Sequence, residues 1–128
     1  MDITNIAYED NCFDVILCNH VLEDIPNDKK AMQELFRVLK PGGWAIIQVP
    51  IDLNREQTFE DPSIVLAEEK ERLFGQYDHV RLYGKDYKNK LEVIGFKVKV
   101  DGYVRTLGKE IIKKHGLKET EDIYFCTK

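Results

Sequence analysis

The sequence predicts an α/β domain built on a mostly parallel sheet. Residues 13–18 and 44–49 form two short apolar runs, which are typical of strands buried on both faces. Between them lies a segment whose apolar residues recur at helical spacing. A strand, a helix of about three turns and a second strand make a βαβ unit, and such a crossover places its two strands parallel.

The connecting helix is expected to begin near Asn27 or Asp28, because either side chain can cap a helix start. Its apolar stripe recurs at i, i+4, i+7 and i+8, namely Ala31, Leu35, Val38 and Leu39. Lys30 and Glu34 lie one turn apart on the side predicted to face solvent. The residues Pro-Gly-Gly at 41–43 are expected to end the helix and turn the chain into the second strand.

Residues 52–84 are polar, and we expect them to form an inserted cap segment with one short helix at 67–74. The alternating pattern of residues 96–100 predicts a strand near a sheet edge. The remaining expected elements are a helix that follows Asp86 and ends before Gly95, a short helix at 109–115, and a last strand at 123–126.

With 128 residues, the chain fits a single domain, residues 1–128. Its 43% hydrophobic and 33% charged residues are typical of a globular protein. The net charge of -4 argues against nucleic acid as a partner. No apolar run approaches the roughly 20 residues of a membrane span, and the amino end has no signal-peptide pattern. We therefore expect a cytoplasmic protein that does not contact a membrane.

The cysteines and histidines predict no metal site. Cys12, Cys18 and Cys126 form no CxxC pair, and we expect them to be reduced and structural. The three histidines are far apart in the sequence and show no zinc-ligand spacing.

Three motifs carry a family resemblance: NCFDVI at residues 11–16, NHVLE at 19–23 and RVLKPGG at 37–43. In this order, preceded by Asp2-Ile3-Thr4, they resemble the small-molecule class I S-adenosylmethionine-dependent methyltransferases. The resemblance covers roughly residues 2–50. It implies a Rossmann-like doubly wound sheet, mostly parallel, with an antiparallel last strand.

The chain departs from this family in two respects. It has Asp24 where the family often has histidine, and it has no glycine-rich E/DxGxG segment. Because that segment and a following acidic residue belong to the first two strands, we expect a partial sheet that lacks the first three strands. The chain thus resembles the C-terminal portion of such an enzyme.

The resemblance also implies S-adenosylmethionine as cofactor and gives four residues a part in binding it. Asp2 would accept the adenine amino group, and Ile3 would lie along the adenine ring. Asn19 and His20, at the carboxyl end of the first strand, would line the methionine side, since ligands of open parallel sheets bind beyond such ends. The alternatives are a turn cap for Asn19, a backbone hydrogen bond for His20 and a mobile terminus for Asp2.

Three residues of the inserted segment are candidates for the substrate side. His79 is a candidate general base, because histidine has a pKa near neutral pH. Arg81 is placed to hold a carboxylate or phosphate group by paired hydrogen bonds, and Tyr83 to line an aromatic pocket with other tyrosines of the chain. The alternatives are ion pairs with Asp78 or Glu71 for the loop histidine and arginine, and core packing for Tyr83.

Without the missing strands, the strand that begins at Phe13 would have an unpaired edge. We therefore expect a homodimer, or a complementing chain, that pairs through this edge. The leading hypothesis is a methyltransferase acting on a small molecule. The alternative is a non-catalytic binding or scaffolding domain that uses the same edge, and RVLKPGG speaks against a third option, a nucleotide-binding domain of other chemistry.

Overall fold

The computed structural model describes all residues from Met1 to Lys128 and confirms the α/β prediction. Its main sheet has four strands in the order β1-β2-β6-β5. Their bounds are Phe13–Asn19 for β1, Leu39–Gln48 for β2, Ile123–Thr127 for β6 and Lys97–Asp101 for β5. β1 and β2 are parallel, and β6 runs antiparallel to both of its neighbours. Three strands therefore share one direction and only the last is reversed, as expected.

The helix between β1 and β2 is α1 (Asp28–Val38), and it begins where the capping residues predict. The Asn27 side chain accepts a hydrogen bond of 3.1 Å from the backbone N–H of Lys30, which satisfies a donor of the first turn. With 11 residues α1 is the longest helix, and no helix of the chain is long and apolar enough to cross a bilayer.

The Pro-Gly-Gly sequence lies inside β2 instead of before it, which corrects the expected strand start. Leu39 already pairs with Phe13, and the register then shifts before Val15 pairs with Trp44. Two glycines make this irregularity possible. Gly42 has a φ of 80°, and a Cβ atom on Gly43 would lie 2.8 Å from the carbonyl oxygen of Asp14.

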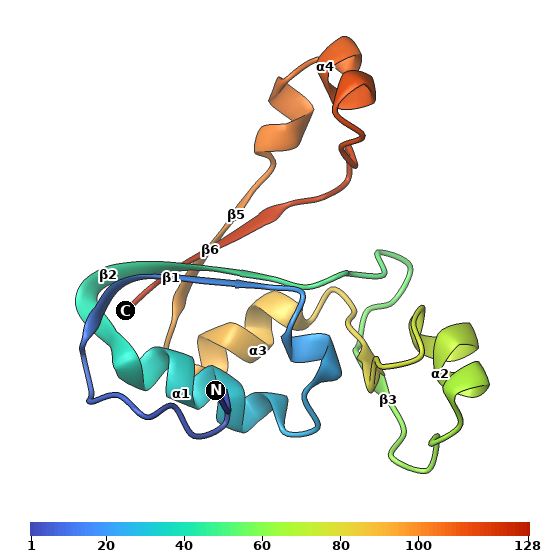
Figure 1. Cartoon of the computed structure of the whole chain (residues 1–128). Helices are drawn as coiled ribbons and strands as arrows, with labels where there is room; N and C mark the ends of the chain where they lie inside the picture. The colour runs from blue at the N-terminus through green and yellow to red at the C-terminus, as the bar shows by residue number, and fades with distance from the viewer.

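One face of the sheet carries the hydrophobic core. α1 and α3 (Tyr87–Ile94) lie against this face, and Figure 1 shows no helix packed flat on the other. Tyr87 is fully buried at the centre of the core, and its hydroxyl donates to the carbonyl oxygen of Ile47 at 3.0 Å.

The opposite face is open at β1, so the expectation of burial on both faces was wrong for this strand. The exposed fractions of Val15 and Leu17 are 44% and 65%. β1 also pairs with β2 alone and is an edge of the sheet. Both features agree with the predicted unpaired edge. At the other edge lies β5, as its alternating pattern indicated.

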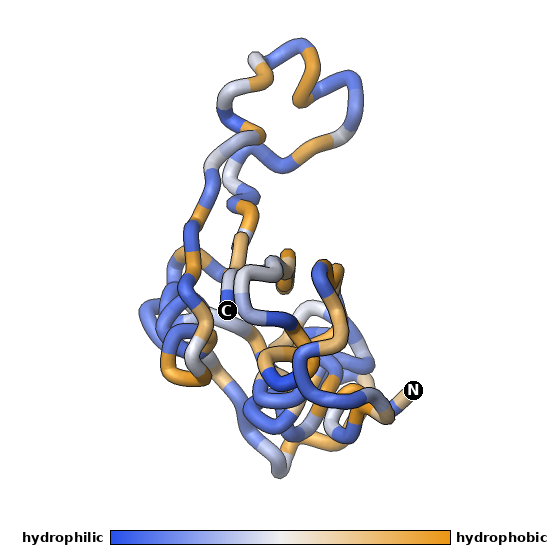
Figure 2. The backbone as a smooth tube through the Cα atoms, turned by 90° about the vertical axis from the view of Figure 1, so that its left-hand side faces the viewer, coloured by the Kyte–Doolittle hydropathy of each residue, from blue (hydrophilic) through white to orange (hydrophobic).

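Two further segments project from this body. The inserted segment contains β3 (Phe59–Glu60), α2 (Ala67–Phe74) and β4 (Arg81–Leu82), and β3 pairs antiparallel with β4. Between β5 and β6 the chain forms a short 3-10 helix, η2 (Tyr103–Thr106), and α4 (Lys109–Lys114). Figures 1 and 2 show that this connection extends well away from the helices that cover the sheet.

Candidate functional site

The carboxyl end of β1 carries two of the residues expected at the cofactor. Asn19 is the last strand residue and pairs with Gln48. His20 follows with a φ of 54°, and its backbone N–H donates to the carbonyl oxygen of Gln48 at 2.9 Å. Its half-exposed imidazole has Nδ1 3.6 Å from Oε1 of Glu23 and lines a cavity of about 120 Å³. The chain therefore turns sharply at the end of the strand and leaves both side chains exposed.

Asp2 and Ile3 line a larger cleft along β1. This cleft has a volume of about 580 Å³ and is bordered by residues of β1, of the following turn and of α1, namely Ile16, Leu17, Cys18, Val21, Ile25 and Leu35. Its size falls within the range of about 300–1,000 Å³ typical of ligand sites. The structure thus brings the amino end to the strand edge, while His20 borders a separate cavity.

The carboxylate of Asp2 has one oxygen occupied and one free. Oδ1 accepts hydrogen bonds from the backbone N–H and the hydroxyl of Thr4 at 2.8 and 2.7 Å. These two bonds stabilise the charged form and lower the pKa of Asp2. Oδ2 has no hydrogen-bond partner within the chain and stays available as an acceptor.

The structure corrects the substrate role expected for Arg81. Its side chain is only 1% exposed, and its guanidinium donates to the backbone carbonyl oxygens of Leu22, Ile25 and Pro26 at 2.5–2.9 Å. Nε donates to Oε2 of Glu60 at 3.2 Å. Because these partners occupy the guanidinium, Arg81 joins the inserted segment to the turn after β1, and its donors are not free to bind a substrate.

Tyr83 is also a core residue, which corrects the second substrate prediction. It is fully buried, and its hydroxyl donates to Oδ2 of Asp28 at 2.6 Å. Its ring packs edge-on against Tyr87 with 4.8 Å between the centroids. Burial, together with the charge of Asp28, raises its pKa far above the usual value. The alternative of core packing is therefore the one the structure supports.

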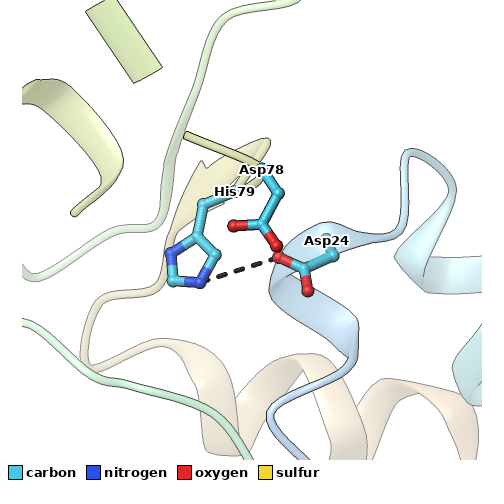
Figure 3. A group of neighbouring side chains, drawn as sticks. All are labelled: Asp24, Asp78 and His79. Atoms are coloured by element: carbon cyan, nitrogen blue, oxygen red, sulfur yellow. Dashed lines mark ion pairs between the residues drawn. The ribbon is translucent and has the colours of Figure 1, made fainter. Parts of the chain in front are cut away.

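His79 lies in a group of acidic side chains between α2 and β4. Its Nε2 is 3.6 Å from Oδ1 of Asp24 and 3.9 Å from Oε1 of Glu23, while Asp78 extends toward the same place (Figure 3). Its Nδ1 is 3.1 Å from the carbonyl oxygen of Phe74. His79 borders none of the cavities described above, so its general-base role stays a prediction.

The two carboxylates near His79 come from η1 (Leu22–Asp24), the 3-10 helix after β1. Burial is the main cause that raises the pKa of Glu23, and burial followed by the charge of Asp78 raises the pKa of Asp24. The sequence places Glu23 and Asp24 side by side but gives no signal that both approach a histidine more than 50 residues later. That proximity depends on how the inserted segment folds back.

The amino-terminal part of the chain matches a known protein family in sequence. Residues 1–47 match the family model described as "Methyltransferase domain". A ubiquinone/menaquinone biosynthesis C-methyltransferase of Hydrogenovibrio crunogenus is 42% identical over 48 residues, which are 35% of this chain and 19% of that protein. An uncharacterized protein of Methanocaldococcus jannaschii is 32% identical over 99 residues, which are 76% of this chain and 36% of that protein. The matched parts thus span well under half of these relatives.

Solved structures match nearly the whole chain. An S-adenosylmethionine-dependent methyltransferase from Mesorhizobium loti has a TM-score of 0.61 at 12% identity, covering 100% of this chain and 67% of that one. A protein from Bacillus halodurans that is described as a "putative methyltransferase" has a TM-score of 0.55 at 21% identity, covering 98% of this chain and 64% of that one. At these identities the matches establish the fold.

Proposed function

Since this chain is a class I S-adenosylmethionine-dependent methyltransferase domain in its fold and in the sequence of residues 1–47, we propose that it binds S-adenosylmethionine and serves methyl transfer to a small molecule. The observation that carries the proposal is the apolar cleft along β1, because Asp2 and Ile3 border it together with Leu17 and Cys18. The inserted residues 52–84 are proposed to cap the acceptor side.

The cleft is chemically suited to the adenosyl part of the cofactor. A flat heterocycle gains from apolar contact, which Ile3 and Val21 offer, and its exocyclic amino group needs an acceptor, which Oδ2 of Asp2 offers. Asn19 and His20 at the end of β1 would line the methionine side. When bound, the cofactor supplies an electrophilic methyl group on a sulfonium centre.

Little acid–base chemistry is required of the protein, because methyl transfer is an in-line displacement that depends chiefly on positioning. The residues of the cleft would hold and orient the cofactor and exclude water from it. A general base matters only for an acceptor that must lose a proton, and His79 stays the candidate. Its Nε2 faces Asp24 and Glu23, so an acceptor would reach it only beside these carboxylates.

The chain contains no E/DxGxG segment, so a complete cofactor site needs backbone that residues 1–128 do not provide. We propose that this backbone comes from a complementing chain whose strands pair with the free edge of β1. In a homodimer a second copy would pair with the same edge, but it lacks the segment as well. Such pairing would also cover Val15 and Leu17, whose exposed apolar side chains favour it.

Calorimetric titration with S-adenosylhomocysteine, the demethylated product, tests the cofactor proposal. We expect weak binding to the chain alone, further weakened about tenfold in Asp2→Asn, which exchanges a charged acceptor for a neutral amide. Glu9→Gln is the matched control, because Glu9 is exposed and borders no part of the cleft. Absence of any binding at millimolar ligand would contradict the proposal.

The alternative function is a non-catalytic scaffolding domain, and the open edge of β1 is the observation that favours it. The same titration separates the two functions. A chain that associates through β1 but binds no S-adenosylhomocysteine, alone or associated, would have the scaffolding function.

A further inference from the structure

We propose that Asp24, Asp78 and His79 form a binding site for a divalent transition-metal ion such as Zn²⁺. The site lies apart from the proposed cofactor cleft, because none of the three residues borders that cleft. A bound ion would occupy Nε2 of His79 and would replace the general-base role proposed for it. The site would join η1, directly after β1, to the turn before β4.

The three side chains already have nearly the spacing that such an ion requires. One potential ligand atom from each residue lies within 4.8 Å of the others. Ligands about 2.1 Å from a tetrahedral ion lie about 3.4 Å from one another, and Nε2 of His79 is 3.6 Å from Oδ1 of Asp24. Asp78 is exposed, so its side chain is free to rotate inward. Figure 3 shows all three side chains directed toward one point.

His79 is held in the orientation of a metal ligand. A carbonyl oxygen only accepts hydrogen bonds, so the contact of 3.1 Å between Nδ1 and the carbonyl oxygen of Phe74 places the proton on Nδ1. In the neutral ring Nε2 then carries the lone pair, and it points at Asp24. Histidine ligands commonly donate their other N–H to a backbone carbonyl in this way, which fixes the ring. The side chain is 9% exposed and Nε2 has no hydrogen-bond partner of its own.

A buried carboxylate beside the three residues gives independent support. The Glu23 side chain is 3% exposed, its Oε1 lies 3.9 Å from Nε2 of His79, and its Oε2 has no hydrogen-bond partner. Oδ1 of Asp24 is buried without a partner as well. Buried acceptors without donors are rare and destabilising. A cation between Asp24 and His79 would bind Oδ1 directly and would attract the carboxylate of Glu23.

No lysine or arginine is free to pair with these carboxylates, and the basic side chains that approach them are His79 itself and His20. The charge of Arg81 opposes the rise that burial causes in the pKa of Asp24. The guanidinium of Arg81, however, already donates its hydrogen bonds to three carbonyl oxygens and to Glu60. The Nδ1 atom of His20 lies 3.6 Å from Oε1 of Glu23, the same oxygen that lies 3.9 Å from Nε2 of His79.

The donor set selects the class of metal. Mg²⁺ and Ca²⁺ prefer oxygen ligands alone, whereas one imidazole with two carboxylates suits Zn²⁺ and its first-row neighbours. With three protein ligands, a fourth position would be left for water or for Glu23.

Titration of ZnCl₂ into the purified chain, followed by calorimetry and by thermal unfolding, tests this site. We expect binding of one Zn²⁺ per chain, a rise in the unfolding temperature, and much weaker binding of Mg²⁺. Asp78→Asn should weaken Zn²⁺ binding at least about tenfold, and His79→Gln should do the same. Because Asp78 is exposed, Asp78→Asn should fold normally even if the buried His79→Gln does not.

His115→Gln and Cys12→Ser are the controls, since they remove other possible Zn²⁺ ligands far from the site, and both should bind like the wild type. The site is overturned if the wild type binds no Zn²⁺ at millimolar concentration, or if Asp78→Asn binds as tightly as the wild type. It is overturned equally if one of the controls abolishes binding. Binding of Mg²⁺ as tight as that of Zn²⁺ would overturn the assignment to a transition metal.

Discussion

The carboxylate of Glu34 accepts two hydrogen bonds from the guanidinium of Arg37, at 2.9 Å from Nε and 2.8 Å from Nη2. Both residues lie on α1, and the same pair holds the amino-terminal segment. Glu34 accepts from the backbone N–H of Ile6 at 2.8 Å, and Arg37 donates to the carbonyl oxygen of Ile6 at 2.9 Å. The pair therefore positions the segment that carries Asp2 and Ile3 beside β1.

Replacement of Glu34 by glutamine should reduce the acid sensitivity of the fold. The hydrogen bonds from Arg37 lower the pKa of Glu34 from 4.5 to about 2. A pKa that is lower in the folded state gives stability that is complete above 4.5 and is lost as pH falls toward 2. We expect Glu34→Gln to be less stable than the wild type at neutral pH, with the difference shrinking as pH falls. Urea unfolding of both proteins across this pH range measures the difference in stability. A difference that does not change with pH would contradict the prediction.

Replacement of Arg81 by methionine should destabilise the protein by about 3–5 kcal/mol, because it leaves buried acceptors and the carboxylate of Asp28 without their partner. Arg72→Met on the exposed side of α2 is the control and should change stability by less than about 0.5 kcal/mol. Urea unfolding of the two variants measures the difference. Equal stabilities would show that the guanidinium network contributes nothing.

The three cysteines should differ in reactivity toward a thiol reagent at about pH 8. Burial raises the pKa of Cys18 to about 11 and that of Cys126 to about 12, so neither forms thiolate readily in the folded chain. Cys12 is only half-buried. We expect one rapidly labelled thiol in the native protein, identified by mass spectrometry as Cys12, and three after denaturation. Rapid native labelling of Cys18 or Cys126 would contradict the structure.

The open edge of β1 should make the wild-type chain associate. Leu17→Lys places a charge on the exposed flank of this strand and should shift the chain toward monomer in sedimentation velocity experiments. Val93→Lys, at a residue of α3 that is 72% exposed, is the control and should leave the association unchanged. A wild-type chain that sediments as a monodisperse monomer would rule out the proposed pairing.

The βαβ unit was predictable from the sequence because its signals are local. The cap at Asn27 and the apolar stripe of α1 act within one or two turns of helix. Gly95, with a φ of 131°, ends α3 by the same kind of short-range effect. Local signals failed where a residue makes a distant contact. Glu34 was expected to face solvent and is buried, because it binds Ile6, 28 residues earlier in the chain.

Short-range patterns therefore sufficed for the helices α1 to α4 and for the strands β1, β5 and β6, whereas β2 begins earlier than expected and β3 and β4 were not predicted. The free edge of β1 followed from the family resemblance. Chain packing alone decided which polar side chains meet. Arg81 bonds to Leu22 across 59 residues, and His79 meets Asp24 only because the inserted segment folds back onto η1. The physical reason is that buried polar groups must find partners wherever the fold brings them. Periodicity and capping describe the preferences of one segment and carry no information about its eventual neighbours.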